Sequence, residues 1–312
     1  MIGRWLRGRR NRKVAQDLMS KLRAGSDAFR GATLTDIWRI SRTKTILRIV
    51  SGGETRLALF FHRNDPAEVA ENVFFAHENL SVHLADMPGM GVPRAVAVVP
   101  EAGCVVTEFI DAPDLQSLLT GGTAGEGVIR AARWLSALHG AFPGRPGTCD
   151  FGEIAQAVER DLVSRDLPSP IRQLREGFVA RAAELDRHQT SFVKFHKDFA
   201  PRNVLIGADM TWAVDLTNTR WRMPEMDLAH FLLEASIDMG DTGTRGRWGL
   251  PPALLDQVQA GYGLEERDLE FIPPHLCALI LRQWGQAAGT NSRTARHRAP
   301  LLKAMAEGFA FD

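Results

Sequence analysis

The first third of the chain alternates between short apolar runs and polar breaks. Apolar and β-branched runs at residues 34–41, 45–51 and 55–61 are separated by RTKT and GGE, which predicts antiparallel strands joined by tight turns. RAVAVV at 94–99 and GCVVTEFI at 103–110 predict two further strands with PEAG as their turn. We therefore expect a small five-stranded sheet.

Helical periodicity begins after the third of these strands and dominates the chain beyond Asp111. Residues 67–85 repeat apolar positions on one helical face, and Pro66 suits a first helical turn. Further along, helices are predicted at 114–119, 128–142, 154–165 and 171–188. Short strands interrupt this helical part only at 192–196, 203–207 and 212–216.

Composition narrows the class of protein. A chain of 312 residues with 45% hydrophobic and 24% charged residues is long enough for about two domains and is not of a disordered class. The 38 Lys and Arg nearly cancel the 37 Asp and Glu, which argues against nucleic acid as a partner. Three widely separated cysteines disfavour a disulfide framework or a zinc site, and we expect a reducing, cytoplasmic location.

The amino-terminal segment differs from the balanced remainder. MIGRWLRGRRNRK contains six basic residues and no acidic one, interleaved with apolar residues, and it leads into the predicted helix VAQDLMSKLRA. Residues 1–13 would therefore allow peripheral contact with an anionic membrane surface. A solvated basic helix end is the simpler interpretation.

Residues suited to phosphoryl transfer gather in one segment, SFVKFHKDFAPRNVLIGADMTWAVDL. Asp198, Asn203 and Asp215 lie on loops bounded by short apolar strands, and His196 precedes Asp198 by two positions. This chemistry needs one carboxylate to take the proton of the acceptor hydroxyl, and an amide oxygen and a second carboxylate to hold Mg²⁺ against the nucleotide phosphates. Asp and Asn are also common turn residues, and His196 would equally serve as a buried histidine that packs the loop.

The same segment resembles the aminoglycoside phosphotransferase and choline kinase superfamily of kinase-like phosphotransferases. The catalytic loop of that superfamily reads roughly H-G-D-x-x-x-x-N, and HKDFAPRNVLI fits it with Lys197 in place of the usual Gly. DLTNTRWRMPEMDLAHFL resembles the metal-binding stretch, in which an Asp is followed twelve residues later by Asp-Leu-Ala, here at Asp227. VVTEFI at 105–110 resembles the interlobe hinge, and AARWLSALHG resembles a helix that ends in Leu-His.

The resemblance implies an α+β, protein-kinase-like two-lobed fold, with a small antiparallel β-sheet N-lobe that has one helix and a larger, mainly helical C-lobe. The expected parts are a basic helix or extension at 1–26, a nucleotide-binding N-lobe at 27–110 and a C-lobe at 111–312. ATP and Mg²⁺ would bind between the lobes, and the γ-phosphoryl group would pass to a hydroxyl of a small molecule. The implied site residues are Asp198 and His196 in catalysis, Asn203 and Asp215 as metal ligands, Glu108 at the hinge as a nucleotide contact, and Asp227 as a brace of the catalytic loop.

A kinase-like site also needs a cation on the third strand to hold the nucleotide phosphates, paired with a Glu of the next helix. If residues 55–61 form that strand, the cation position falls on Phe60, and the cation is missing or has moved. If TILRIV forms it, Arg48 occupies the position, and residues 31–40 become a glycine-loop hairpin that begins at Gly31. The second register resembles the choline kinase-like pattern and is preferred. The candidate partners of Arg48 are Glu71 first, then Glu68 and Glu78.

The acceptor is less determined by the sequence. Acidic residues after 230 would suit an amine or aminoglycoside, and two tryptophans would suit a quaternary ammonium group, although all of these also fit a solvated face or a core. These residues are Glu234, Asp238, Asp241, Trp248 and Trp284. An amino alcohol, an aminoglycoside or a sugar is expected. The alternatives are a kinase of a lipid-linked or cell-envelope sugar at the membrane surface, and a nucleotide-binding pseudokinase.

Overall fold

The structure is a computed structural model in which residues 2–62, 65–163, 165–216, 220–265, 269–290 and 292–311 are described, with side chains from residue 11 onward except at 293. The chain divides into two compact units. The first contains Met1–Ala112 and Val214–Asn218, and the second contains Pro113–Ala213 and Thr219–Asp312. The division after Ala112 lies close to the lobe boundary expected at residue 110.

The first unit is built on a five-stranded antiparallel sheet, as the sequence predicts, with the strand order β1-β2-β3-β6-β5. Asp65 begins the helix after β3 by accepting hydrogen bonds from the backbone N–H groups of Ala67 and Glu68, and Pro66 occupies the first turn. The elements are α1 (Ile2–Gly25), β1 (Thr33–Ile40), β2 (Lys44–Ser51), β3 (Glu54–Phe61), α2 (Pro66–Leu84), β4 (Met90–Gly91), β5 (Ala95–Val99) and β6 (Cys104–Glu108), with short 3₁₀ helices at Asp27–Phe29 and Pro100–Ala102.

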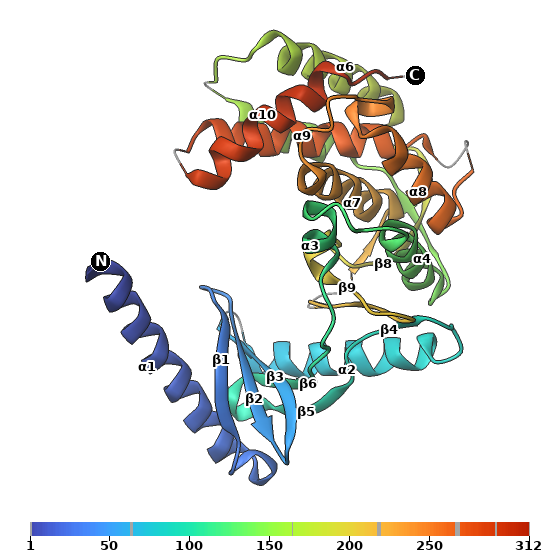
Figure 1. The fold of residues 1–312 in the computed structure, drawn as a ribbon. Coiled ribbons are helices and arrows are strands. Elements are labelled where there is room, and N and C mark those ends of the chain that lie inside the picture. The colour runs from blue at the N-terminus through green and yellow to red at the C-terminus, as the bar shows by residue number, and fades with distance from the viewer. Residues whose placement is uncertain are drawn as a thin grey trace. The chain divides into compact units, whose positions relative to one another are not determined.

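Two helices cover opposite faces of this sheet (Figure 1). On one face Leu22 of α1 joins a cluster that contains Phe60, and on the other Val73 of α2 joins Leu59 and Phe61. Neighbouring strand residues point to opposite faces, so Phe60 faces α1 and not α2. The sequence assigned one helix to the sheet; α1, expected as an extension, is a second, because its apolar face completes the core.

The glycine-loop hairpin predicted for residues 31–40 is wrong. Residues 33–40 form the single strand β1, and the turn into β2 falls at residues 41–43. The hydroxyl of Ser41 accepts hydrogen bonds from the backbone N–H groups of Thr43 and Lys44, which closes this turn without a glycine. Gly31 precedes β1, at the end of the strand away from Lys44.

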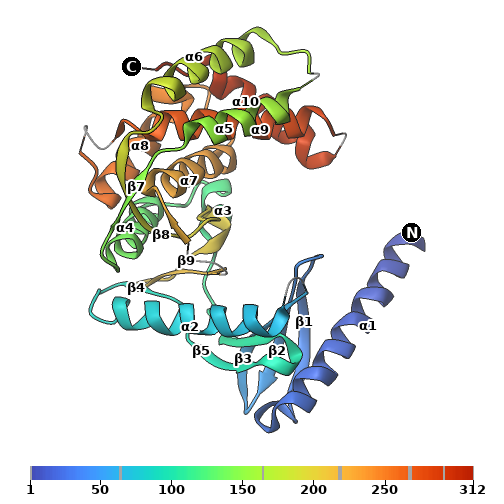
Figure 2. The same cartoon turned by 180° about the vertical axis from the view of Figure 1, so that it is seen from behind.

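The second unit is mainly helical. α9 is central to it and packs against α5, α6, α7 and α10 (Figure 2). One small sheet has the order β11-β8-β7, and β9 and β10 form a hairpin. The elements are α3 (Leu115–Thr120), α4 (Gly127–Gly140), β7 (Arg145–Thr148), α5 (Phe151–Leu162), α6 (Ser169–Leu185), β8 (Gln189–Phe195), β9 (Val204–Ile206), β10 (Thr211–Ala213), β11 (Arg220–Arg222), α7 (Pro224–Met239), α8 (Pro252–Tyr262), α9 (Ile272–Ala288) and α10 (Arg293–Glu307), with 3₁₀ helices at Pro201–Asn203 and Arg247–Gly249.

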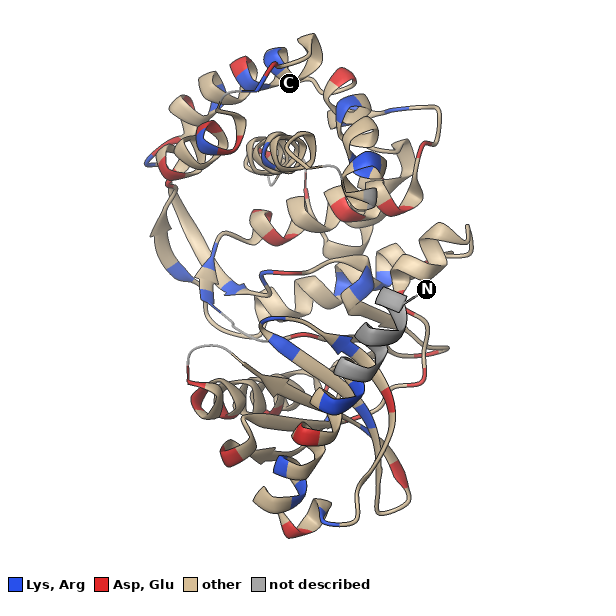
Figure 3. Ribbon diagram, turned by 90° about the vertical axis from the view of Figure 1, so that its left-hand side faces the viewer, with Lys and Arg blue, Asp and Glu red and all other residues tan. Residues whose placement is uncertain are grey.

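Acidic and basic residues are interspersed over both units (Figure 3), in keeping with the small net charge. Within the described part of the chain, no helix is both long and apolar enough to cross a membrane. Of the basic segment at 1–13, for which contact with an anionic membrane is predicted, the side chains of residues 1–10 lie outside the described ones.

Candidate active site

A buried carboxylate on α7 holds the backbone of the predicted catalytic loop. Asp227 is 0% exposed, and its two oxygens accept hydrogen bonds from the backbone N–H groups of His196, at 2.6 Å, and Lys197, at 3.0 Å. The same carboxylate lies 3.2 Å from Nε2 of His139, at the end of α4. A carboxylate only accepts, so Nε2 donates, and Nδ1 of His139 accepts from the hydroxyl of Tyr262 at 2.7 Å. The predicted brace by Asp227 is confirmed.

Asp198 and Asn203 lie together at the end of this loop. Nδ2 of Asn203 donates to the carbonyl oxygen of Asp198 at 2.8 Å and to its Oδ2 at 3.1 Å. No described residue donates to Oδ1 of Asn203, the atom suited to a cation. The Asp198 carboxylate is 42% exposed, so a substrate hydroxyl can reach it.

Arg202 is a partner of Asp198 for which the sequence assigned no role. Its guanidinium donates to Oδ1 of Asp198 at 2.6 Å and to the Glu234 carboxylate at 3.2 Å. Glu234 is buried and accepts further bonds from Arg298 at 2.5 Å and Gln283 at 3.1 Å. Burial alone would raise the pKa of Glu234, but the hydrogen bond and charge of Arg298 outweigh it and lower the pKa. A chain of alternating charges thus orients the Asp198 carboxylate.

His196 lies in the core of the second unit. Its side chain is buried, and its ring makes edge contacts with Trp134 and Phe199, with ring centroids 6.2 and 5.4 Å away. The backbone of His196 is tied to Asp227, as described above. These contacts agree with the interpretation of His196 as an architectural histidine that packs the loop.

In the first unit, a buried cation meets the second predicted metal ligand. Nζ of Lys44, at the start of β2, lies 2.5 Å from Oδ1 of Asp215, and the two side chains are 9% and 18% exposed. Lys44 is directly opposite Phe61 in the register of β2 and β3, so it lies on the α2 face of the sheet. Asp215 has a φ of +68°, a left-handed conformation that Asp tolerates better than most residues. The sequence missed this cation.

The other nucleotide-binding candidates are placed apart from Lys44. The guanidinium of Arg48 lies over the ring of Phe109, 4.3 Å from its centroid, and Phe109 contacts Trp38 edge to face. Glu71 is exposed, and the expected ion pair between Arg48 and Glu71 is not formed in the part of the chain that the structure describes. Oε1 of Glu108 accepts a hydrogen bond from the backbone N–H of Arg94 at 2.8 Å.

The structure therefore brings together one pair of predicted site residues in the second unit, and in the first unit it pairs one predicted residue with a lysine that the sequence missed. Asp198 and Asn203 belong to the second unit, and Asp215, with Lys44, belongs to the first.

One register of the sequence put the cation position on Phe60. In the structure Phe60 faces α1, on the opposite side of the sheet from Lys44 and α2. Residues 54–61 form the third strand, β3, so the structure has the register that puts the cation position on Phe60. The preferred register, with TILRIV as the third strand, is wrong, because those residues lie in β2. The third strand has no cation at Phe60, and the cation that meets Asp215 is Lys44 of β2.

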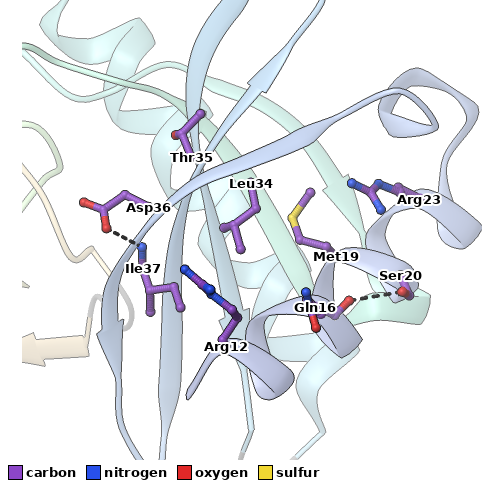
Figure 4. Close-up of a pocket in the computed structure, with 9 residues that line it drawn as sticks. All are labelled: Arg12, Gln16, Met19, Ser20, Arg23, Leu34, Thr35, Asp36 and Ile37. Carbon is purple, nitrogen blue, oxygen red and sulfur yellow. Dashed lines mark hydrogen bonds between the residues drawn. The ribbon is translucent and has the colours of Figure 1, made fainter. Parts of the chain in front are cut away.

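The first unit also has a hollow of about 630 Å³ between α1 and β1 (Figure 4). Arg12 and Gln16 of α1 line it together with Leu34 and Ile37 of β1. Lys44, Asp215 and Arg48 do not line it. We assign this hollow no part in phosphoryl transfer.

Comparison with known proteins identifies the class. A sequence model of the phosphotransferase enzyme family, APH, matches residues 31–274, which is more than half of the chain. The chain therefore belongs to this family of kinase-like phosphotransferases. Membership confirms the predicted enzyme class, an ATP-dependent phosphotransferase with an alcohol group as acceptor. No curated protein matches the sequence at a significant level.

Solved structures share the fold at low identity. A choline/ethanolamine kinase family protein from Mesorhizobium loti has a TM-score of 0.60 at 19% identity and covers 93% of this chain and 94% of its own. A spectinomycin phosphotransferase, solved with ADP and spectinomycin, has a TM-score of 0.58 at 13% identity, with 88% of each chain covered. A choline kinase from Streptococcus pneumoniae has a TM-score of 0.57 at 14% identity, over 95% of this chain and 98% of its own. The predicted kinase-like fold is confirmed.

Proposed function

We propose that this protein is a kinase that uses ATP and Mg²⁺ to phosphorylate a hydroxyl group of a small molecule, with Asp198 as the base. The observation that supports this most directly is the catalytic loop, in which Asp227 fixes the backbone in front of Asp198 and Asn203 bonds to Asp198. Among proteins of the same fold, an amicoumacin kinase was solved with AMP-PNP and Ca²⁺. The cytoplasmic location stays a prediction.

The residues of the catalytic loop have different roles in phosphoryl transfer. Asp198 orients the acceptor hydroxyl and takes its proton as the acceptor oxygen bonds to the γ-phosphorus. The bond between that phosphorus and the bridging oxygen breaks, and ADP leaves. Arg202 holds the carboxylate in place until the hydroxyl arrives, because it bonds to Oδ1 and leaves Oδ2 to Asn203 and the substrate.

Asn203 and Asp215 have the right donor chemistry for Mg²⁺. An amide oxygen and a carboxylate are hard oxygen ligands, and Mg²⁺ in phosphoryl-transfer sites is held by only one or two protein groups together with phosphates and water. When bound, Mg²⁺ supplies positive charge that neutralises the phosphate oxygens. In the described chain, no cluster of three or more His, Cys, Asp or Glu residues competes for the ion.

We assign the phosphate-binding cation to Lys44, in place of the expected Arg48. Lys44 already meets the carboxylate of Asp215, and the residues of the neighbouring strand β3 that lie nearest to it on the same face, Leu59 and Phe61, are apolar. Because Lys44 lies opposite Phe61 of β3, a lysine at this position of β2 is close to where a third-strand lysine would bind the nucleotide phosphates. Arg48 instead lies against Phe109, next to the hinge.

Exchanging Lys44 for Met should therefore weaken ATP binding by about 10- to 100-fold, the value of one charged hydrogen bond. Arg48→Met should weaken binding less, and Lys44→Arg should keep part of the affinity. Calorimetric titration with ATP and Mg²⁺ measures this, with Lys21→Met on the exposed face of α1 as the control and thermal unfolding as the check on folding. A larger loss in Arg48→Met than in Lys44→Met would restore Arg48 to the role.

The function itself is tested by a metabolite screen. The protein is incubated with ATP, Mg²⁺ and a mixture of hydroxyl compounds, and products heavier by one phosphoryl group are identified by mass spectrometry. Asp198→Asn provides the matched control. If the wild-type protein binds ATP but transfers phosphate to no acceptor and not to water, the pseudokinase alternative is correct.

A further inference from the structure

A cavity of about 230 Å³ lies in the second unit beside the catalytic loop. Lys197, the residue before Asp198, lines it, and so does His230, whose Nε2 is 3.9 Å from Oδ1 of Asp198. The other walls come from α5, the end of β8, the start of α7 and one face of α9. A molecule in this cavity would therefore touch Lys197 and His230, both of which adjoin the proposed base.

Lys197 occupies this wall at a conformational cost. Its φ is +77°, in the left-handed region that glycine adopts freely and lysine does not. Glycine is the residue that the sequence motif leads one to expect at this position, so a lysine retained there in a strained conformation points to a use for its side chain. Lys197 is exposed, and no described carboxylate pairs with its ammonium group.

The other polar residues that line the cavity add no negative charge. None of the described residues that line the cavity is acidic. Arg282 adds a second cation, whose Nε donates to Asp161 at 2.8 Å. Burial lowers the pKa of His275 to about 4 and also lowers the pKa of His230, so both histidines are neutral near pH 7. The charge of Arg282 is balanced by Asp161, so the electrostatic character of the wall is set by Lys197.

Of the five acidic and aromatic residues considered for a cationic acceptor, all but the exposed Asp241 are engaged elsewhere. Glu234 is bound by Arg298 and Arg202, and Asp238 accepts a hydrogen bond from Gln116 at 2.6 Å. Trp248 and Trp284 are buried in the core. These side chains therefore offer no cluster of free carboxylates or open aromatic box for an ammonium group.

We propose that this cavity is the acceptor site and that the acceptor is a small alcohol with a carboxylate or phosphate group, bound by Lys197. This inference deepens the proposed function and rests on it. The ammonium group of Lys197, with which no described carboxylate pairs, binds the anionic group. The volume is below the range of cavities for drug-sized ligands, so the acceptor is of the size of a hydroxy acid or a triose phosphate rather than an aminoglycoside.

The first experiment compares acceptors that differ in charge. Glycerate and glycerol 3-phosphate are assayed against ethanolamine, choline and kanamycin, with ATP and Mg²⁺ present and Asp198→Asn as the control. We expect kcat/KM to be at least 10-fold higher for the anionic alcohols. Turnover of the cationic acceptors alone would overturn the acceptor class and leave the proposed function intact, whereas ATP binding without any turnover would count against the proposed function.

The second experiment tests Lys197 by binding, so it does not depend on turnover. In Lys197→Gln the affinity for glycerate and glycerol 3-phosphate, measured by calorimetry, should fall by about 10- to 100-fold. Lys303→Gln, an exposed lysine of α10, is the matched control and should bind as the wild type does. Equal affinity in Lys197→Gln and wild type, or no binding of either anion to the wild type, would overturn the assignment.

A glycine variant separates the side chain from the backbone. Lys197→Gly should lose the same affinity without lowering the midpoint of thermal unfolding, because glycine adopts the native φ without strain. Arg187→Gly, at another positive φ, should likewise keep its unfolding midpoint and should not change anion binding. A Lys197→Gly protein that binds the anions as tightly as the wild type contradicts a role for the side chain.

Discussion

Asp198→Asn should lower kcat by about 10²- to 10⁴-fold, the range in which a positioned general base contributes. Asparagine has nearly the same shape, but its amide cannot take the proton of the acceptor hydroxyl. The amide oxygen can keep the hydrogen bond from Arg202, and Asn203 loses its bond to Oδ2 but keeps the one to the carbonyl oxygen of residue 198, so the loop geometry should survive. The affinity for ATP should change by only a few fold, because Asp198 is assigned no direct contact with the nucleotide.

Steady-state kinetics with the acceptor found in the screen measures the loss, and calorimetry with ATP measures the affinity. Equal thermal unfolding midpoints for the variant and the wild type establish that the protein is folded. Asp209→Asn, on the exposed turn between β9 and β10, is the matched control and should keep wild-type kcat. An Asp198→Asn protein that keeps more than a tenth of the wild-type kcat would remove Asp198 from the role of base.

The sequence predicts the part of the site whose residues are close together along the chain. Asp198 and Asn203 are five positions apart, so their spacing alone brings them into contact across one short 3₁₀ turn. The brace at Asp227 is more distant, but the resemblance to a known family supplied it. The five strands could also be predicted, because each apolar run ends at a clear turn.

The features that the sequence missed depend on pairings between distant segments. Lys44 and Asp215 are 171 positions apart, and neither has a neighbouring residue that signals the pair. The face on which Phe60 lies depends on the strand register, because a shift by one residue reverses every side chain. The sequence could not show that Glu234 is already bound within the protein, because its partners Arg298 and Gln283 come from the distant helices α10 and α9. Glu234 was therefore considered as a substrate contact.

Asp227→Asn should destabilise the second unit by about 2–4 kcal/mol, although it changes only one oxygen to an NH₂ group. The native carboxylate accepts bonds from two backbone N–H groups and from His139. The N–H of His196 and Nε2 of His139 share Oδ2, and the N–H of Lys197 bonds to Oδ1, so the NH₂ group of an amide faces at least one buried donor. That donor and the NH₂ group then both lack an acceptor, and each such group costs about 1–3 kcal/mol. Because His196 and Lys197 precede Asp198, the base should also lose its fixed position, and kcat should fall with little change in ATP affinity.

Hydrogen exchange distinguishes this local effect from general unfolding. In Asp227→Asn the amides of His196 and Lys197 should exchange faster, whereas those of the β2 and β3 pairs in the first unit should keep their protection. His139→Ala removes one of the three donors and leaves the two backbone bonds in place, so it should destabilise the protein less than Asp227→Asn. If both variants lose the same stability and the amide of Lys197 stays protected, the carboxylate does not hold the loop, and the geometry that supports Asp198 as the base must come from Arg202 and Asn203 alone.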